Sequence, residues 1–149
     1  MDMGVYSVHG VRHAMGMEPA AITAQAFNTR TEKFTDVEET LYRQMYFKSG
    51  IIAKCMTSYS ARAGHVLIHA DQGSYKLEPA FGYGPLKLAV KGELIDIPHT
   101  NHQAVQMDAF ARNIIDGTPV IANGMEGLND LKVIEAIYKA ASTGENVDV

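Results

Sequence analysis

The sequence predicts an α+β fold, in which an open-faced, mostly antiparallel sheet has helices packed on one side. Two observations predict it. Apolar residues recur at helical spacing near both ends of the chain, and strand patterns separated by turn signals fill residues 39–97. Three helical segments are too few to cover both faces of such a sheet. The uncovered face is therefore expected to be polar or to be buried against a partner.

The composition is that of one globular domain, and we expect residues 1–149 to form it. The chain is 46% hydrophobic and 20% charged, which supports a single core and argues against disorder. Its net charge of −4, with scattered Lys and Arg, gives no indication of a nucleic-acid partner. Without a long apolar run or a secretory leader, we expect no membrane partner and a cytoplasmic location. A periplasmic location stays open if an export signal precedes these residues.

The first helix is expected over residues 2–15, with Asp2 as its cap and Gly16 as its stop. Its apolar residues recur at helical spacing: Val5, Val8 and Met15. A strand over residues 20–27 and an exposed polar loop over residues 28–38 follow. This part of the chain therefore predicts a helix, then the first strand.

Period-two alternation begins at Glu39 and predicts a series of hairpins. The expected strands are 39–47, 51–58, 65–69, 74–77, 86–90 and 93–97. In the first of them, Tyr42, Gln44 and Tyr46 alternate with Leu41, Met45 and Phe47. Because tyrosine and glutamine are amphipathic, that side suits a protein–protein interface. Cys55, within the second strand, is interpreted as a buried structural thiol.

Two closing helices are expected, the first capped by Asn101 and ended by Gly117, the second over residues 125–142 and ended by Gly144. The first carries an apolar stripe of Ala104, Met107, Phe110, Ala111 and Ile114. The second carries Leu128, Leu131, Ile134, Ile137, Tyr138 and Ala141. Both stripes are typical of amphipathic helices.

Several short motifs occur in a specific order along nearly the whole chain. They are Met1-Asp2-Met3-Gly4-Val5-Tyr6, Gly10-Val11-Arg12, Gly16-Met17-Glu18-Pro19, Thr57-Ser58-Tyr59-Ser60, Gln106-Met107-Asp108, and Gly127-Leu128-Asn129-Asp130 with the helix after it. In this order they resemble the C-terminal domain of the glucose–fructose oxidoreductase (Gfo/Idh/MocA) family. That family consists of NAD(P)-dependent sugar and polyol oxidoreductases.

The resemblance implies that the complete enzyme has an N-terminal dinucleotide-binding Rossmann domain, whose Glu-Lys-Pro motif supplies a catalytic lysine. Neither feature occurs in this sequence: Gly82-Tyr83-Gly84-Pro85 is interpreted as a turn, and Glu32-Lys33 precedes Phe34. We therefore expect this chain to bind no cofactor alone and to be inactive alone. NAD(P) would act in the two-domain enzyme, with the Rossmann half missing or on a separate chain.

The resemblance also implies a site. Oxidation of a hydroxyl by hydride transfer needs a base for the hydroxyl proton, and a tyrosine can serve if a nearby cation or hydrogen bond lowers its pKa. By resemblance Tyr6 is the proton carrier, and Asp2, one turn earlier, orients it or the substrate. The alternatives are an ordinary N-cap for Asp2 and a half-buried helix aromatic for Tyr6.

Four further residues are expected to bind substrate: Arg12, His9, Tyr59 and Gln106. Arg12 could instead be a solvated cation at the helix end, Tyr59 could pack across strands, and Gln106 could lie on a solvated helix face. His9 and His13 have a spacing that can hold a metal, but no third ligand accompanies them, so no metal is expected.

Two hypotheses about function remain. In the first, the chain is the substrate-binding and oligomerisation domain of a sugar or polyol oxidoreductase, either a fragment or the product of a split gene. In the second, it is a free-standing module that dimerises through its sheet or binds a small sugar without catalysis. Both predict a homo-oligomer, a dimer through the open sheet face. The sequence does not identify the sugar or distinguish NAD from NADP.

Overall fold

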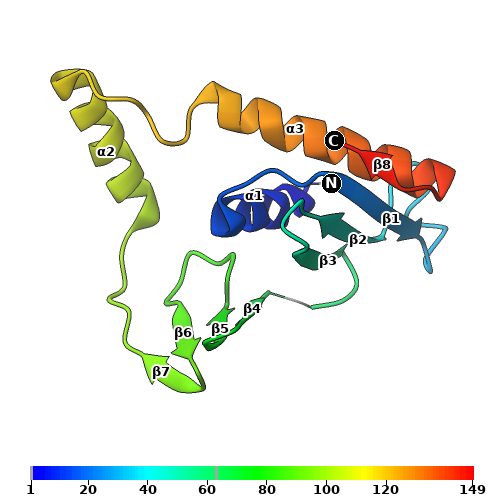
Figure 1. Cartoon of the computed structure of the whole chain (residues 1–149), viewed down its shortest axis with the longest axis horizontal. Coiled ribbons are helices and arrows are strands. Elements are labelled where there is room, and N and C mark those ends of the chain that lie inside the picture. The colour runs from blue at the N-terminus through cyan, green and yellow to red at the C-terminus, as the bar shows by residue number, and fades with distance from the viewer. Residues whose placement is uncertain (1, 63) are drawn as a thin grey trace. The chain divides into compact units, whose positions relative to one another are not determined.

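The computed structural model describes residues 2–62 and 64–149 and confirms the α+β class. Among these residues it contains three helices and two four-stranded sheets, and every strand pair in the sheets is antiparallel. The chain divides into two compact units (Figure 1). Unit 1 comprises residues 2–62 and 122–149, and unit 2 comprises residues 64–121. Two sheets form where the strand patterns suggested one, because periodicity identifies strands without saying which of them pair.

Unit 1 contains two helices and one sheet. Its elements are α1 (Gly4–Met15), β1 (Ala21–Phe27), β2 (Thr40–Tyr46), β3 (Ile52–Ser58), α3 (Gly124–Thr143) and β8 (Val147–Asp148). The strands lie in the order β3-β2-β1-β8. The predicted helices and strands of this unit are confirmed. One further strand, β8, was not predicted. That strand has only two residues, too few to show a period, and it forms by pairing Val147 with Ile22 of β1.

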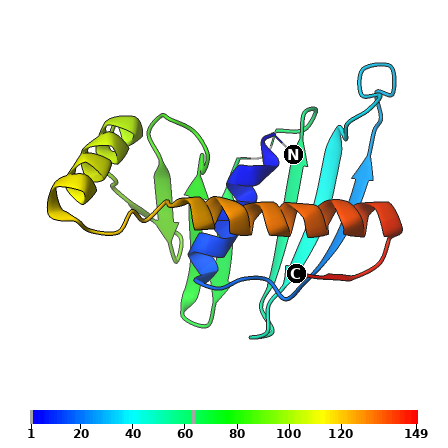
Figure 2. The ribbon, with the colours of Figure 1, turned by 90° about the horizontal axis from the view of Figure 1, so that it is seen from above.

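One face of this sheet is covered by α1 and α3 (Figures 1 and 2). The alternation in β2 directs Leu41, Arg43 and Met45 toward the helices, where all three are buried. The apolar core comprises Val8, Ile22, Ala24, Leu41, Met45, Phe47, Val133, Ala136, Ile137, Ala140 and Val147. The other face carries Tyr42, Gln44 and Tyr46 and has no helix of unit 1 over it, which confirms the predicted open-faced sheet.

Unit 2 consists of an antiparallel meander and one helix. Its elements are β4 (Val66–Ala70), β5 (Gly73–Glu78), β6 (Lys87–Val90), β7 (Glu93–Ile95) and α2 (His102–Asp116). The strands are adjacent in chain order, as the hairpin signals predicted. None of its described residues is buried. Unit 2 therefore has regular backbone pairing without a closed core of its own.

The helix ends confirm most of the predicted signals. The Asn101 side chain accepts from the Ala104 amide at 3.1 Å, and Gly16, Gly117 and Gly144 end their helices with φ of 61°, 64° and 71°. The predicted cap at Asp2 is wrong. Because α1 begins at Gly4, the cap position falls on Met3, whose side chain makes no capping bond.

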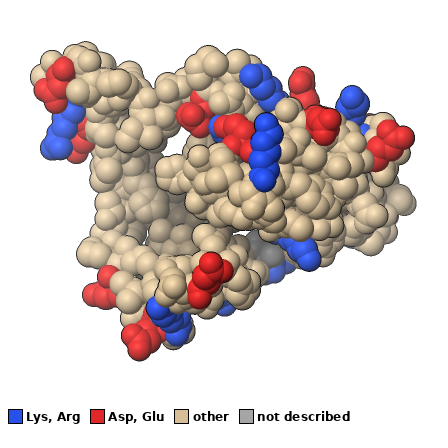
Figure 3. Space-filling view, in the orientation of Figure 1, with Lys and Arg blue, Asp and Glu red and all other residues tan. Residues whose placement is uncertain are grey.

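Charged side chains of both signs are interspersed on the face shown in Figure 3. Within the described residues, no helix combines the length and apolar character needed to cross a membrane.

Candidate functional site

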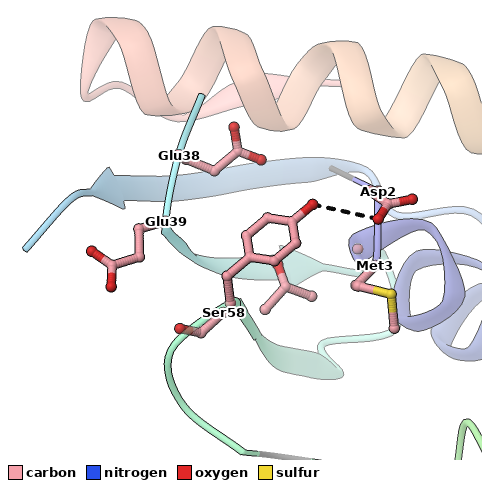
Figure 4. Close-up of a pocket in the computed structure, with 8 residues that line it drawn as sticks. Asp2, Met3, Glu38, Glu39 and Ser58 are labelled. Carbon is pink, nitrogen blue, oxygen red and sulfur yellow. Dashed lines mark hydrogen bonds between the residues drawn. The ribbon is translucent and has the colours of Figure 1, made fainter. Parts of the chain in front are cut away.

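A small pocket lies where the start of α1, the start of β2 and the end of β3 meet (Figure 4). It is lined by Asp2, Met3, Gly4, Glu38, Glu39, Thr57, Ser58 and Tyr59. Its volume of about 20 Å³ is that of a site for one water molecule. The pocket brings together two of the residues that the sequence singled out, Asp2 and Tyr59.

Asp2 and Tyr59 form a hydrogen-bonded pair across this pocket. The Tyr59 hydroxyl donates to Oδ2 of Asp2 at 3.4 Å (Figure 4). Desolvation raises the pKa of Tyr59, and the neighbouring Asp2 carboxylate raises it further. Asp2 is thus held by the hydroxyl of the aromatic residue that directly follows β3, rather than by the helix that it was expected to cap.

A second tyrosine–carboxylate pair joins α3 to the pocket. The Tyr138 hydroxyl donates to Oε1 of Glu38 at 2.9 Å, and Glu38 lines the pocket. Burial and the Glu38 carboxylate together raise the pKa of Tyr138 to about 12. This pair was missed in the sequence, because Tyr138 was assigned to an apolar stripe and its partner lies 100 positions away.

The Glu39 carboxylate anchors the loop before β2. It is buried and accepts from the amides of Thr29 and Arg30 at 2.6 and 2.9 Å and from the Ser60 hydroxyl. These hydrogen bonds hold the pKa of Glu39 well below its usual range, and the bond from Ser60 has the largest effect. Glu39 therefore fixes one wall of the pocket, a role that nothing in the sequence indicated beyond its place at the start of a strand.

Tyr6 lies on α1 with 48% of its surface exposed. Gly4, two residues earlier, lines the pocket. Tyr6 is thus a half-exposed aromatic residue of α1, and its catalytic assignment stays a prediction.

Arg12 is buried and surrounded by three carboxylates. Its Nε and Nη2 both donate to Glu18 at 2.6 Å, Nη2 also donates to Glu126 at 3.1 Å, and Nη1 donates to Asp130 at 2.5 Å. The hydrogen bond to Glu18, with that to Asp130, raises the pKa of Arg12. The alternative of a solvated cation at the helix end is therefore wrong. Its donors are engaged by α3 and by the turn after α1, and substrate binding by Arg12 stays a prediction.

His9 shares Asp130 with Arg12. Its Nδ1 lies 3.0 Å from Oδ2 of Asp130, and its ring stacks on that of His13 with centroids 6.2 Å apart. The described residues contain no group of three side chains that could hold a metal. Gln106 is exposed on α2 of unit 2. Substrate binding by His9, Tyr59 and Gln106 stays a prediction.

Comparison with known proteins decides the family. Residues 1–76 match the GFO/IDH/MocA C-terminal domain. The chain belongs to this family. An aldose–aldose oxidoreductase of Caulobacter crescentus, solved with glycerol, is 31% identical and superimposes with a TM-score of 0.88 over 98% of this chain and 46% of its own.

Two other similar proteins match this chain over a comparable extent. D-xylose 1-dehydrogenase (NADP(+)) 2 of Haloferax volcanii is 25% identical over all of this chain and 47% of its own. Myo-inositol 2-dehydrogenase of Lactobacillus plantarum, at 17% identity and a TM-score of 0.75, shares the fold over 97% of this chain and 46% of its own. The chain thus spans about half the length of these relatives. The three relatives named above are sugar or polyol oxidoreductases, and each is matched over about half of its own chain.

Proposed function

We propose that this chain is the substrate-binding and oligomerisation half of an NAD(P)-dependent oxidoreductase that oxidises a hydroxyl of a small sugar or polyol. The observation that carries the proposal is the position of Tyr6, which follows the pocket residue Gly4 by two positions in the chain and is half exposed. The named relatives act on aldoses and on inositol. Alone, the chain does not turn over substrate.

In this proposal the Oη of Tyr6 carries the proton of the reacting hydroxyl, and Asp2 and Tyr59 hold neighbouring hydroxyl groups. A carboxylate oxygen accepts from a sugar hydroxyl, while a tyrosine hydroxyl can donate or accept. The existing bond between Asp2 and Tyr59, at 3.4 Å, is long for a bond between oxygens. A substrate hydroxyl can therefore replace it at little energetic cost.

The nucleotide is held by another half of the enzyme in this proposal. A dinucleotide site uses parallel strands, with a glycine-rich turn that leads into a helix N-terminus. The described strands of this chain pair antiparallel throughout both sheets. These residues do not fit a nicotinamide nucleotide, which supplies a hydride acceptor when it is bound.

The exposed apolar residues of α2 support the proposal that this helix is a docking surface for the nucleotide-binding half. Met107, Phe110 and Ile114 lie on one stripe and are 66%, 52% and 68% exposed, and no residue of α2 is buried. A helix of 15 residues is marginally stable in water without tertiary packing. We propose that a nucleotide-binding domain, on the same or a separate chain, covers this stripe.

The open face of the unit 1 sheet supports self-association. On this face Phe27 of β1 stacks on Tyr42 of β2 with ring centroids 5.9 Å apart, and Tyr42 pairs with Met56 of β3. A groove of about 490 Å³ runs over the same strands. An exposed surface of aromatic and apolar side chains is typical of an interface, and a stable dimer buries roughly 1,200–2,000 Å².

The proposed chemistry is tested with the chain joined to the nucleotide-binding half of a GFO/IDH/MocA relative. Tyr6→Phe keeps the ring and removes the proton carrier, so turnover with aldoses or polyols is expected to fall by at least ~10²-fold. The melting temperature should change little, since Tyr6 is half exposed. Tyr83→Phe, an exposed tyrosine of unit 2, is the matched control. A Tyr6→Phe enzyme within a few-fold of its parent contradicts the proposal.

Self-association is tested by sedimentation of the chain and of Tyr42→Glu. The introduced carboxylate would be buried at the interface without a partner, so the variant should sediment as a monomer where the parent is a dimer. Tyr83→Glu should remain a dimer. A parent chain that stays monomeric at high micromolar concentration contradicts this part of the proposal.

A further inference from the structure

The sheet of unit 1 contains a buried arginine. Arg43 lies on β2 between Leu41 and Met45, on the face covered by the helices, and is 2% exposed. Among the described residues, no carboxylate forms a salt bridge with it, and its Nε is buried with no hydrogen-bond partner. Burial lowers the pKa of Arg43. A cation in this position destabilises the core relative to an apolar residue of the same size.

The guanidinium group is directed at the first turn of α1. Its Nη2 donates to the Gly4 carbonyl oxygen at 3.3 Å and to the Ser7 hydroxyl. The Ser7 hydroxyl in turn donates to the same carbonyl at 2.9 Å. On the sheet side, Nη1 donates to the hydroxyl of Thr57 on β3 at 3.4 Å. Arg43 therefore links the beginning of α1 to two strands.

This link lies beneath the candidate site. Gly4 lines the pocket next to Asp2, and Tyr6 follows within the same helical turn. The N-terminal end of a helix already carries a partial positive charge, so a cation beneath it costs additional free energy. Arrangements that cost folding free energy in this way are found at functional sites, where the position of a side chain matters more than stability.

We propose that Arg43 is a positioning residue, which fixes the first turn of α1 through Gly4 and Ser7 and thereby sets the place of Tyr6 relative to the substrate. The inference rests on the proposed role of Tyr6. In this role Arg43 increases turnover although its buried charge lowers the stability of the folded chain. The two effects can therefore be measured separately.

The decisive variant is Arg43→Met, which keeps a long apolar stem and removes the charge. In the two-domain enzyme we expect the melting temperature to stay the same or rise, because a buried cation is lost. We expect kcat to fall at least ~10-fold while KM for the nucleotide is unchanged, because a small misplacement of a reacting group is enough to slow catalysis. Arg43→Lys, which keeps one cationic donor, should recover part of the rate. Lys48→Met, in the exposed turn after β2, should match the parent.

A second measurement uses the chain alone. Arg43→Met should speed hydrogen exchange at the amides of residues 7–9 by at least ~10-fold, while the amides of α3 are unchanged. If Tyr6→Phe loses turnover but Arg43→Met keeps it, the positioning role is overturned and the proposed function stands. If Tyr6→Phe keeps turnover, the proposed function fails. The exchange experiment still decides whether Arg43 fixes this turn, and an unchanged rate there overturns the inference independently.

Discussion

The two units of this chain differ in the interactions that stabilise them. Unit 1 has an apolar core between α1, α3 and the sheet, and polar side chains buried within it, among them Arg12, Glu39, Arg43 and Asp130. Unit 2 has complete antiparallel pairing from β4 to β7, yet none of its described residues is buried. Backbone pairing alone leaves a sheet marginally stable, since most of the stabilisation comes from burial of a side-chain face. We therefore expect unit 1 to account for most of the stability of the chain.

The largest effect is expected at Arg12 of unit 1. Arg12→Met removes the guanidinium group from the buried Asp130, which then keeps only its contact with His9, and should lower the free energy of unfolding by about 3 kcal/mol. Arg112→Met, on the exposed surface of α2, should change it by less than about 0.5 kcal/mol. Urea denaturation measures both. Equal effects at the two arginines would break the distinction between the units.

A matched pair of isoleucines sharpens the same comparison. Ile137 of α3 is fully buried, whereas Ile114 of α2 is 68% exposed. Ile137→Ala should cost about 2–5 kcal/mol through lost burial and the cavity it leaves. Ile114→Ala should cost about 0.5 kcal/mol or less in the chain alone. If a nucleotide-binding half covers α2, the cost of Ile114→Ala should increase in the two-domain enzyme. The absence of such an increase would count against docking at this stripe.

The sequence was informative about elements and less so about what lies between them. Gly16, Gly117 and Gly144 ended helices as predicted, because only a glycine adopts positive φ without strain. The alternation of Leu41 with Tyr42 gave the buried and open faces of β2. The same alternation places residue 43 inward, and an arginine there was the signal of the unusual link to α1.

The candidate site was predicted where its parts are local in sequence or carried by a family motif. Asp2 and Tyr59 were both expected, and the structure brings them into hydrogen-bond contact. Glu39 with its loop, and Tyr138 with Glu38, depend on contacts across 9 to 100 positions. A charged residue has no period that reveals such a partner, so these contacts could not be derived from spacing.

An intermediate effect is expected from pH, and it too should depend on unit 1. The pKa of Glu39 is lowered in the folded chain, so its contribution to stability is complete above the unfolded value near 4.5 and is lost as the pH falls below it. The melting temperature of the parent should therefore fall progressively from about pH 5 downward, and the fall should continue below about pH 3 because the folded pKa of Glu39 lies well below its usual range. Glu39→Gln should lower it at neutral pH and flatten this dependence. Glu78→Gln, whose partner is the exposed Lys76, should leave the slope nearly unchanged. Identical slopes for the parent and Glu39→Gln would contradict the assignment.

The smallest effect is expected at the ion pair of unit 2. Lys76 Nζ lies 2.5 Å from Oε2 of Glu78, as close as Arg12 lies to Asp130, but both side chains are about half exposed. In water the attraction between two charges is weak, and exposed pairs contribute about 0–1 kcal/mol. Lys76→Met should therefore change the free energy of unfolding by less than about 0.5 kcal/mol, and adding salt should remove even that difference. The measurement is urea denaturation at low and high ionic strength, beside Arg12→Met. A loss approaching that of Arg12→Met would show that unit 2 shares in the cooperative unfolding of the chain, and the contrast between the two units would then have to be abandoned.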